Sequence, residues 1–326
     1  MLSQGNTWSL ILAAGSGVRL RNLTTTPSGT VIPKQFWCLR GGPSLLDLAL
    51  ERAHVVSANC HTCAIVAEQH RRWWEPALWC LPAANVIVQP ENRGTANGIL
   101  LPLLHILERD PAARLVVLPS DHHVRQEAVL ARALRHAVEQ WRWHFDETVL
   151  LGLQPEQPDP GLGYILPGRA DGRGALEVLQ FIEKPTAAQA HELIEHGGLW
   201  NAFIVVASAQ ALLALFRQRV PGIVGEMSAA LQCDLSAHAD GPAVAELYDR
   251  LPSLDFSRDI LQGQECWLRA LPVPQCGWSD LGTPERVSEA LRRMPAAETE
   301  SIGSIGSGYM SLAARSELLN RVASLA

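Results

Sequence analysis

A short glycine turn followed by basic side chains is the first group of residues in this sequence that could do chemistry. Gly15 and Gly17 follow an apolar run at residues 8–14, which is long enough for one buried strand. Backbone N–H groups in such a turn are not covered by side chains, so they can bind an anionic oxygen. Residues 1–46 contain no Asp or Glu in a chain of net charge −6, yet they include Arg19, Arg21, Lys34 and Arg40. This positive region indicates a small polyphosphate ligand, because a nucleic acid would need a broad basic surface.

Known glycine-rich loops fit this turn poorly. A Walker-type loop ends in Gly-Lys-Ser/Thr, which is absent near Gly15. A dinucleotide-binding loop needs a third glycine, where the chain has Leu20, and an acidic residue about 20 positions later. The first acidic residue is Asp47. Taken by itself, the turn also fits an ordinary strand end with solvated basic residues.

Asp121 follows another apolar run, residues 114–118, and could bind a metal ion. A strand there would place its carboxylate at the rim of a sheet, where it could bridge Mg²⁺ to substrate phosphates or simply cap a turn. Zinc is not expected at the neighbouring His122 and His123. Adjacent residues rarely chelate one ion, and no further ligand has suitable spacing.

The apolar pattern predicts an α/β fold that would position these residues. Strands are expected at 62–67, 85–88 and 114–118, and helices at 45–53 with Ser44 as the cap, 69–79, 94–109 and 124–143. This alternation builds a parallel sheet with right-handed crossovers, and ligands bind at the carboxyl ends of its strands. A strand at 148–153 and a hairpin of residues 163–166 and 176–182 then make the sheet mixed and add a second wall over the cleft. The later segments predict helices at 209–219, 220–233 and 241–251 and a strand at 266–271.

Residues 12–20 and 33–36 resemble the signature of sugar-1-phosphate nucleotidyltransferases, with the sequences Leu-Ala-Ala-Gly-Ser-Gly-Val-Arg-Leu and Pro-Lys-Gln-Phe. The Lys-Gln-Phe version is most similar to that of mannose-1-phosphate guanylyltransferases. The resemblance implies a Rossmann-like nucleotidyltransferase fold, a mainly parallel mixed sheet flanked by helices. It implies that Arg19 and Lys34 contact the nucleotide phosphates and the α-phosphorus, and that the nucleotide also contacts Ala13, Ala14, Gly15, Ser16 and Gly17.

Later segments resemble further motifs of the same family, in the same order. Residues 89–97 are similar to the segment around the base, which implies base or ribose contacts for Gln89, Asn92, Gly94 and Thr95. Similar sugar-binding segments imply sugar contacts for Gly163, Glu183, Lys184, Asn201 and Asp255. Asp121 resembles the family's catalytic metal ligand, and Asp280 the second one. The pair would share one Mg²⁺.

The sequence also departs from the family pattern. Ala14 replaces a glycine, Val18 replaces a threonine, and Phe203 replaces a glycine beside Asn201. Residues 94–97 differ from the usual order at the base, and the loop at 21–32 is longer than expected, which suggests a mobile lid. These departures leave open which base is bound, what shape the sugar pocket has, and whether the chain is active.

The resemblance implies transfer of a nucleotidyl group from GTP to mannose 1-phosphate, giving GDP-mannose and pyrophosphate. One alternative is another base or sugar, with UTP, dTTP or CTP and glucose 1-phosphate. A second is a regulatory protein that binds a nucleotide sugar and has lost turnover. All three take a nucleoside triphosphate or sugar phosphate as partner, with no nucleic acid or membrane.

Length and composition give the expected organisation. Residues 1–293 are expected to form the catalytic domain, with a nucleotide-binding half at about 1–150 and a sugar-binding half at about 151–293. Residues 294–326 read as a linker and a helix, which packs on its own domain or on a second copy in a homodimer. Without a signal sequence or an apolar run of about 18 residues, a cytoplasmic location is expected. The seven cysteines are expected to be reduced and mostly buried.

Overall fold

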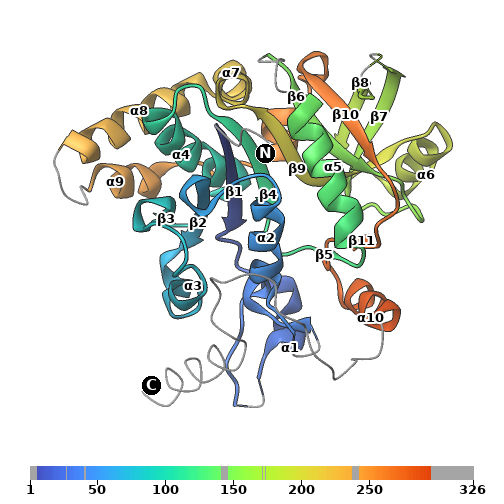
Figure 1. Cartoon of the computed structure of the whole chain (residues 1–326), viewed down its shortest axis with the longest axis horizontal. Coiled ribbons are helices and arrows are strands. Elements are labelled where there is room, and N and C mark those ends of the chain that lie inside the picture. Colours follow the sequence, from blue (N-terminus) through green and yellow to red (C-terminus); the bar gives the residue numbers. More distant parts are fainter. Residues whose placement is uncertain are drawn as a thin grey trace. The chain divides into compact units, whose positions relative to one another are not determined.

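A mixed sheet of nine strands organises the computed structural model, which describes residues 6–26, 28–39, 42–140, 146–170, 172, 174–236 and 242–294. The strand order is β3-β2-β1-β4-β9-β6-β10-β8-β7 (Figure 1). The strands of this sheet are β1 (Thr7–Ala13), β2 (Thr62–Ala67), β3 (Val86–Gln89), β4 (Arg114–Pro119), β6 (Thr148–Leu153), β7 (Gly163–Ala170), β8 (Leu176–Glu183), β9 (Leu199–Ser208) and β10 (Leu268–Val273). The predicted fold class is confirmed.

The first half of the sheet is parallel. β1 pairs in parallel with both β2 and β4, and β2 pairs in parallel with β3. The crossovers run through α2 (Leu45–His54), α3 (Arg71–Ala77) and α4 (Gly94–Arg109). Ser44 caps α2 in a capping box with Asp47, as predicted. The carboxyl ends of β1 and β4 therefore deliver the glycine turn and Asp121 to the same edge of the sheet.

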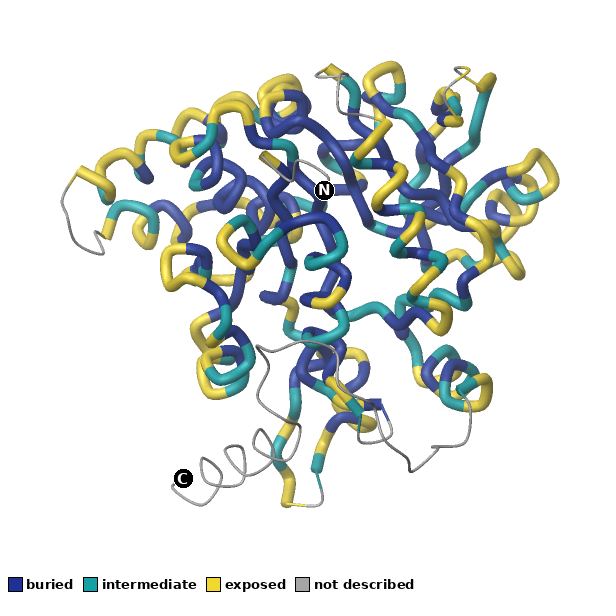
Figure 2. The backbone as a smooth tube through the Cα atoms, in the orientation of Figure 1, coloured by how far each residue is buried: buried dark blue, intermediate teal, exposed yellow. Residues whose placement is uncertain are grey.

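Helices cover both faces of the sheet, and strand β1 supplies side chains to both layers. Leu10 belongs to the apolar cluster that includes residues of α4, α7 (Ala209–Arg219), α8 (Pro221–Ser236) and α9 (Ala243–Arg250). Ile11 belongs to the cluster on the other face, which includes residues of α2, α3, α5 (Glu127–Gln140) and α6 (Ala187–Glu195). Leu10 and Ile11 are both fully buried, and Figure 2 shows this continuous buried layer along the strands. Such two-sided burial explains why the parallel strands are apolar runs without alternation.

Strand β9 joins the two halves, and the sequence analysis did not identify it as a strand. It pairs antiparallel with β4 on one side and with β6 on the other. Its register against β6 shifts between Leu150 and Gly152, and Phe203 has a φ of 57° in the left-handed region. This irregularity interrupts the side-chain alternation by which a strand is recognised.

A second sheet has two strands. β5 (His123–Val124) pairs antiparallel with β11 (Trp278–Ser279), with Ser279 opposite His123. The helix predicted at 124–143 begins only at Glu127 because residues 123–124 belong to β5. The short strand pair is the element that brings the segments of Asp121 and Asp280 together.

The last described helix is α10 (Pro284–Arg293), and the loop after the glycine turn contains α1 (Arg21–Thr24) and a bridge between Thr25 and Val31. The linker and tail helix were predicted at 294–326, and all of these residues except Met294 lie outside the described ones. Within the described ranges, no helix is long and apolar enough to cross a membrane. The prediction of mostly buried cysteines is wrong, since four of the free thiols are exposed, those of Cys38, Cys60, Cys233 and Cys266.

Candidate active site

One cleft of about 340 Å³ at the carboxyl ends of the parallel strands collects most of the predicted site residues. The residues predicted to bind the nucleotide that line this cleft are Ala14, Gly15, Gly17, Arg19, Gln89, Asn92, Gly94 and Thr95. Those predicted to bind the sugar that line it are Gly163, Glu183, Lys184, Asn201 and Asp255, with Asp121 and Asp280 also in the wall. Three predicted site residues are not among the lining residues: Ala13, which is fully buried in β1, Ser16, and the buried Lys34.

The glycine turn is held from behind by the loop that carries Lys34. A Cβ atom at Gly17, which has a φ of 58°, would lie 2.9 Å from the backbone nitrogen of Lys34. The side-chain amide of Gln35 donates to the carbonyls of Ala13 (2.8 Å) and Gly15 (2.9 Å). Only a glycine suits position 17, and the turn and Lys34 are fixed relative to each other. The sequence analysis did not assign this role to Gln35, although the residue stands beside Lys34 in the motif.

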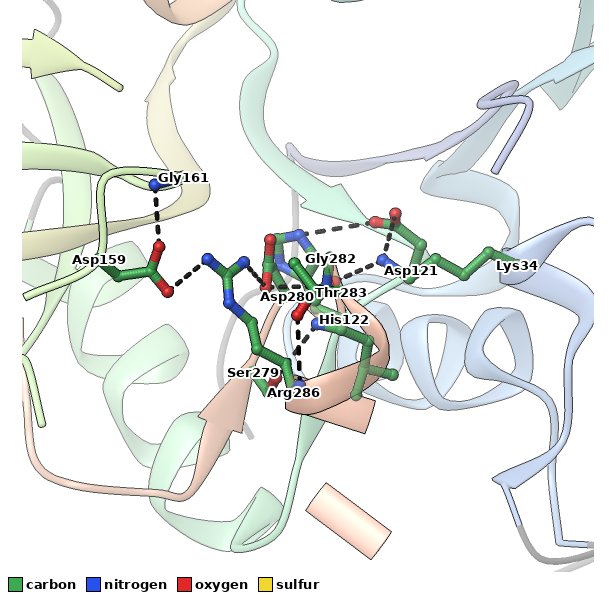
Figure 3. Close-up of polar contacts among 11 residues, drawn as sticks. Lys34, Asp121, His122, Asp159, Gly161, Ser279, Asp280, Gly282, Thr283 and Arg286 are labelled. Carbon is green, nitrogen blue, oxygen red and sulfur yellow. Dashed lines mark hydrogen bonds and ion pairs between the residues drawn. The ribbon is translucent and has the colours of Figure 1, made fainter. Parts of the chain in front are cut away.

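Lys34 is buried beside the cleft and links two aspartates of its wall. Its Nζ donates to Oδ2 of Asp121 at 2.9 Å and to the backbone carbonyl of Asp280 (Figure 3). The Lys34 side chain is 8% exposed, whereas that of Asp121 is 42% exposed toward the cleft. Burial alone would raise the pKa of Asp121, but the Lys34 ammonium outweighs that effect and holds the pKa below its usual value. Asp121 is therefore an ionised group that faces the ligand space.

Asp121 and Asp280 are the two carboxylates of the cleft wall that could hold a cation. Oδ1 of Asp280 accepts hydrogen bonds from Nη1 of Arg286 at 2.5 Å and from the backbone of Gly282 at 3.0 Å. Among the described residues, no group of three or more His, Cys, Asp or Glu side chains could hold a metal. Mg²⁺ commonly takes one or two carboxylates and completes its shell with water and substrate phosphates. Asp121 and Asp280 match that incomplete donor set.

His122 lies beside the aspartates as a neutral imidazole. Burial lowers the pKa of His122 to about 4, even though the nearby Asp121 acts in the opposite direction. Its Nε2 lies 3.5 Å from Oδ1 of Asp121, and its ring packs edge-on against Trp278 with centroids 5.2 Å apart. A neutral ring adds no positive charge that would compete with Lys34 for the carboxylate.

The residues at the start of α4 also hold the chain itself together. The backbone of Gly94 donates to Oδ1 of Asn92 at 3.0 Å. The hydroxyl of Thr95 accepts from the backbone of Phe256 at 2.8 Å. A Cβ atom at Gly94 would collide with the Leu254 carbonyl, so this glycine permits chain packing. The buried Oε1 of Gln89 has no hydrogen-bond partner among the described residues, which leaves an acceptor at the cleft wall.

The opposite wall contains a buried carboxylate and a side-chain amide. Burial raises the pKa of Glu183, and the exposed Lys184 lies 3.1 Å away. A Cβ atom at Gly163 would lie 2.6 Å from Oε2 of Glu183, so the glycine makes room for this carboxylate. Oδ1 of Asn201 accepts from the backbone of Phe203 at 3.1 Å. Asp255 caps the π-helix Phe256–Leu261 through the Arg258 backbone, which gives its carboxylate a structural role as well.

Two further residues next to the site were not identified from the sequence, and they line a neighbouring pocket that shares Trp278 and Asp280 with the cleft. Arg286 bonds both Asp280 and Asp159, and Asp159 accepts from the backbone of Gly161 at 2.8 Å (Figure 3). The sequence feature that could have revealed Arg286 is its place in the first turn of α10, the helix that begins at Pro284 with Thr283 as its cap. Acidic residues are usually favoured there, so an arginine needs a local anionic partner.

Comparisons with known proteins agree with this geometry. The sequence profile of the nucleotidyl transferase family matches residues 8–296. The chain is 29% identical over 301 residues to mannose-1-phosphate guanylyltransferase of Escherichia coli (strain K12), covering 86% of this chain and 59% of that protein. It is 30% identical over 293 residues to the xanthan biosynthesis protein XanB of Xanthomonas campestris pv. campestris (strain B100), covering 84% of this chain and 57% of XanB. The chain thus spans somewhat more than half the length of these relatives.

A solved structure gives the same result for the fold. The crystal structure described as mannose-1-phosphate geranyltransferase from Thermus thermophilus superposes with a TM-score of 0.75 at 26% identity. The match covers 89% of this chain and 80% of that one. With the family profile matching nearly all of the described residues, the chain belongs to the nucleotidyl transferase family.

Proposed function

We propose that the chain transfers a nucleotidyl group from GTP to mannose 1-phosphate, forming GDP-mannose and pyrophosphate. The observation that carries this proposal is the contact of Lys34 with Asp121 and Asp280, both of which line the cleft. A cation and two carboxylate-bearing segments at one point suit a reaction between two phosphate groups. The name of the Escherichia coli relative supports the choice of GTP and mannose 1-phosphate.

In this proposal the triphosphate lies along the glycine turn. The backbone at Gly15 and the guanidinium of Arg19 would bind the β- and γ-phosphates, and Lys34 would reach the α-phosphoryl group. Because Gln35 and the close packing at Gly17 hold the turn against the Lys34 loop, these groups would meet the triphosphate as one preorganised unit. The unpaired Oε1 of Gln89 would accept an N–H of the base.

The sugar phosphate would bind to the opposite wall. Asn201 and Glu183 offer hydrogen-bonding groups to sugar hydroxyls, and Lys184 offers an ammonium to the phosphate. A phosphate oxygen of mannose 1-phosphate then attacks the α-phosphorus in line. The new P–O bond forms as the bond to the β-phosphate bridging oxygen breaks, and pyrophosphate leaves with the electron pair. The attacking oxygen is already anionic, so positioning and charge neutralisation do most of the work.

Asp121 and Asp280 are the residues that would hold Mg²⁺. When bound, the ion supplies charge neutralisation to the phosphate oxygens. Lys34 keeps the Asp121 carboxylate ionised, and Arg286 orients the carboxylate of Asp280.

Pyrophosphate release tests the proposal, measured with GTP, UTP, dTTP and CTP, each with mannose 1-phosphate and with glucose 1-phosphate, in the presence of Mg²⁺. We expect GTP with mannose 1-phosphate to give the highest kcat/KM. A higher value for another pair would replace the base or the sugar in the proposal. Binding of a nucleotide without release from any pair would favour a regulatory protein instead.

A further inference from the structure

Arg286 forms a bridge between two carboxylates of different segments, in a pocket that adjoins the cleft. Nη1 donates to Oδ1 of Asp280 at 2.5 Å, and Nη2 donates to Oδ2 of Asp159 (Figure 3). The three side chains are 15–18% exposed. The positive charge is thus shared between the loop before β7 and the turn after β11.

The surrounding chain leaves space for this guanidinium. A Cβ atom at Gly161 would lie 2.9 Å from Nη2 of Arg286, and one at Gly282 would lie 2.9 Å from Nη1. Both positions therefore favour residues without a side chain. Burial alone would lower the pKa of Arg286, but the charges of Asp280 and Asp159 outweigh it and the pKa rises. In this bridge one largely enclosed guanidinium bonds two carboxylates. An exposed ion pair, by contrast, contributes little to the stability of the fold.

On one side, the bridge continues into the wall that the sugar phosphate would meet. Oδ1 of Asp159 accepts from the backbone of Gly161 at 2.8 Å, which shapes the turn that leads to Gly163. The backbone of Asp159 donates to the Tyr164 hydroxyl at 2.8 Å, and Nε1 of Trp200 donates to the same hydroxyl at 3.0 Å. Trp200 directly precedes Asn201 on β9. Asp159 is therefore linked to the turn at Gly161 directly, and to β9 through the hydroxyl of Tyr164.

On the other side, the bridge ends at the reacting centre. Asp280 accepts two hydrogen bonds from basic side chains. Its carboxylate accepts from Arg286, and its backbone carbonyl accepts from Nζ of Lys34. A displacement of the Asp280 turn would therefore move an acceptor of the Lys34 ammonium. A misplacement of about 1 Å can cost roughly 10²-fold in rate.

We propose that Arg286 is a positioning residue that ties the loop of residues 159–163 on the sugar side to the Asp280 turn that holds Lys34. This inference rests on the proposed function, because its consequence for turnover requires a reaction in this cleft. Arg286 acts through Asp159 and Asp280 and does not itself touch the reacting atoms. The bridge fixes the spacing between the two bound phosphates.

Asp159→Asn is the main test, because it keeps the shape of the side chain and removes one charge of the bridge. We expect kcat to fall about 10- to 100-fold and the KM for mannose 1-phosphate to rise, with the KM for GTP unchanged. Arg286→Lys should recover part of the activity lost in Arg286→Met, because an ammonium retains the charge but cannot bond both carboxylates. In a double-mutant cycle, Asp159→Asn should add little in the Arg286→Met background.

Arg293 provides a matched control. It also joins α10 to the loop before β7, through a 2.6 Å ion pair with Glu156, but that pair is exposed and does not reach Asp280. Arg293→Met and Glu156→Gln should leave kcat and both KM values unchanged. The inference is overturned if Asp159→Asn and Arg286→Met behave like these controls in an active enzyme, or if their effects simply add.

A measurement without turnover separates this inference from the proposed function. Amide hydrogen exchange across residues 278–282 should speed up in Asp159→Asn and not in Glu156→Gln. If the wild-type chain releases no pyrophosphate, the proposed function fails, and exchange still tests the coupling of the two segments. Equal exchange in the two variants would overturn the coupling.

Discussion

The ammonium of Lys34 lies 2.9 Å from the carboxylate of Asp121, although the two residues are 87 positions apart in the sequence. The same ammonium donates to the carbonyl of Asp280, 246 positions from Lys34. Three distant segments thus converge on one cation, and the β5–β11 pair keeps two of them in register. This convergence yields the following predictions.

Removing the ammonium should affect turnover more than binding. In Lys34→Met, we expect kcat to fall about 10²-fold or more, by analogy with the loss of one donor to the transition state. The increase in Tm that GTP produces should be retained, because Arg19 and the glycine turn remain. Lys34→Arg should not restore activity, because a planar guanidinium does not match a site built around a compact ammonium. Arg135→Met, an exposed change on α5, is the control. Unchanged turnover in Lys34→Met would remove Lys34 from the reaction.

Neutralising Asp121 should raise the requirement for magnesium. Asp121→Asn removes the half-exposed carboxylate and keeps the size of the side chain. We expect the Mg²⁺ concentration for half-maximal activity to rise at least roughly tenfold, as carboxylate oxygens are preferred ligands of this ion. The measurement is activity against Mg²⁺ at fixed GTP, with Glu139→Gln on α5 as the control. A curve identical to that of the wild type would exclude Asp121 as a ligand.

Buried His122 should make the protein less stable in mild acid. Its pKa is lowered from 6.5 to about 4 in the folded state. Between these values the unfolded state binds more protons, so the free energy of unfolding falls as the pH falls through this window. One pKa unit corresponds to about 1.36 kcal/mol, which makes the full effect on the order of 3 kcal/mol. Urea unfolding from pH 7 to 4.5 should show a smaller loss in His122→Gln than in the wild type. Parallel losses in the two proteins would contradict the assignment.

Phe203 should be strained by its backbone conformation. Its φ of 57° is costly for a residue with a Cβ atom, by about 1–2 kcal/mol. Phe203→Ala removes the ring that packs against Phe256 and keeps the strain, whereas Phe203→Gly removes both. We therefore expect Phe203→Gly to be more stable than Phe203→Ala by about 1 kcal/mol in urea unfolding. At an ordinary strand position a glycine variant is less stable than an alanine variant. If Phe203→Ala proves more stable than Phe203→Gly, the backbone at this position is not strained.

The sequence predicts the parallel half of the fold well because three of its strands, β1, β2 and β4, are buried on both faces. Continuous apolar runs such as residues 62–67 can be recognised without knowing their neighbours, and Ser44 marks the start of α2 by local chemistry alone. Strand β9 could not be recognised in this way. Its pairing with β4 and β6 is long-range, and the irregularity near Phe203 disturbs its pattern.

The candidate site shows the same division between local and long-range information. Glycines, Lys34 and the aspartates stand out by residue type and by family resemblance. The partners of each group depend on which segments meet, so the Arg286 bridge and the packing of Leu254 against Gly94 could not be read from the sequence. Two glycines that resemble ligand-binding positions, Gly94 and Gly163, also make room for other parts of the protein.

The contrast between enclosed Lys34 and exposed Lys184 has a consequence for chemical labelling, because these two residues are the only lysines in the chain. Apart from the amino terminus, every amine that an acylating reagent can modify either lines the cleft, as in Lys184, or contacts a residue that does, as in Lys34. Lys184, which is 53% exposed, should be acylated first, and Lys34 only when its carboxylate partner is removed. Any lysine acetylation of this chain would therefore fall on a cation proposed to meet a phosphate.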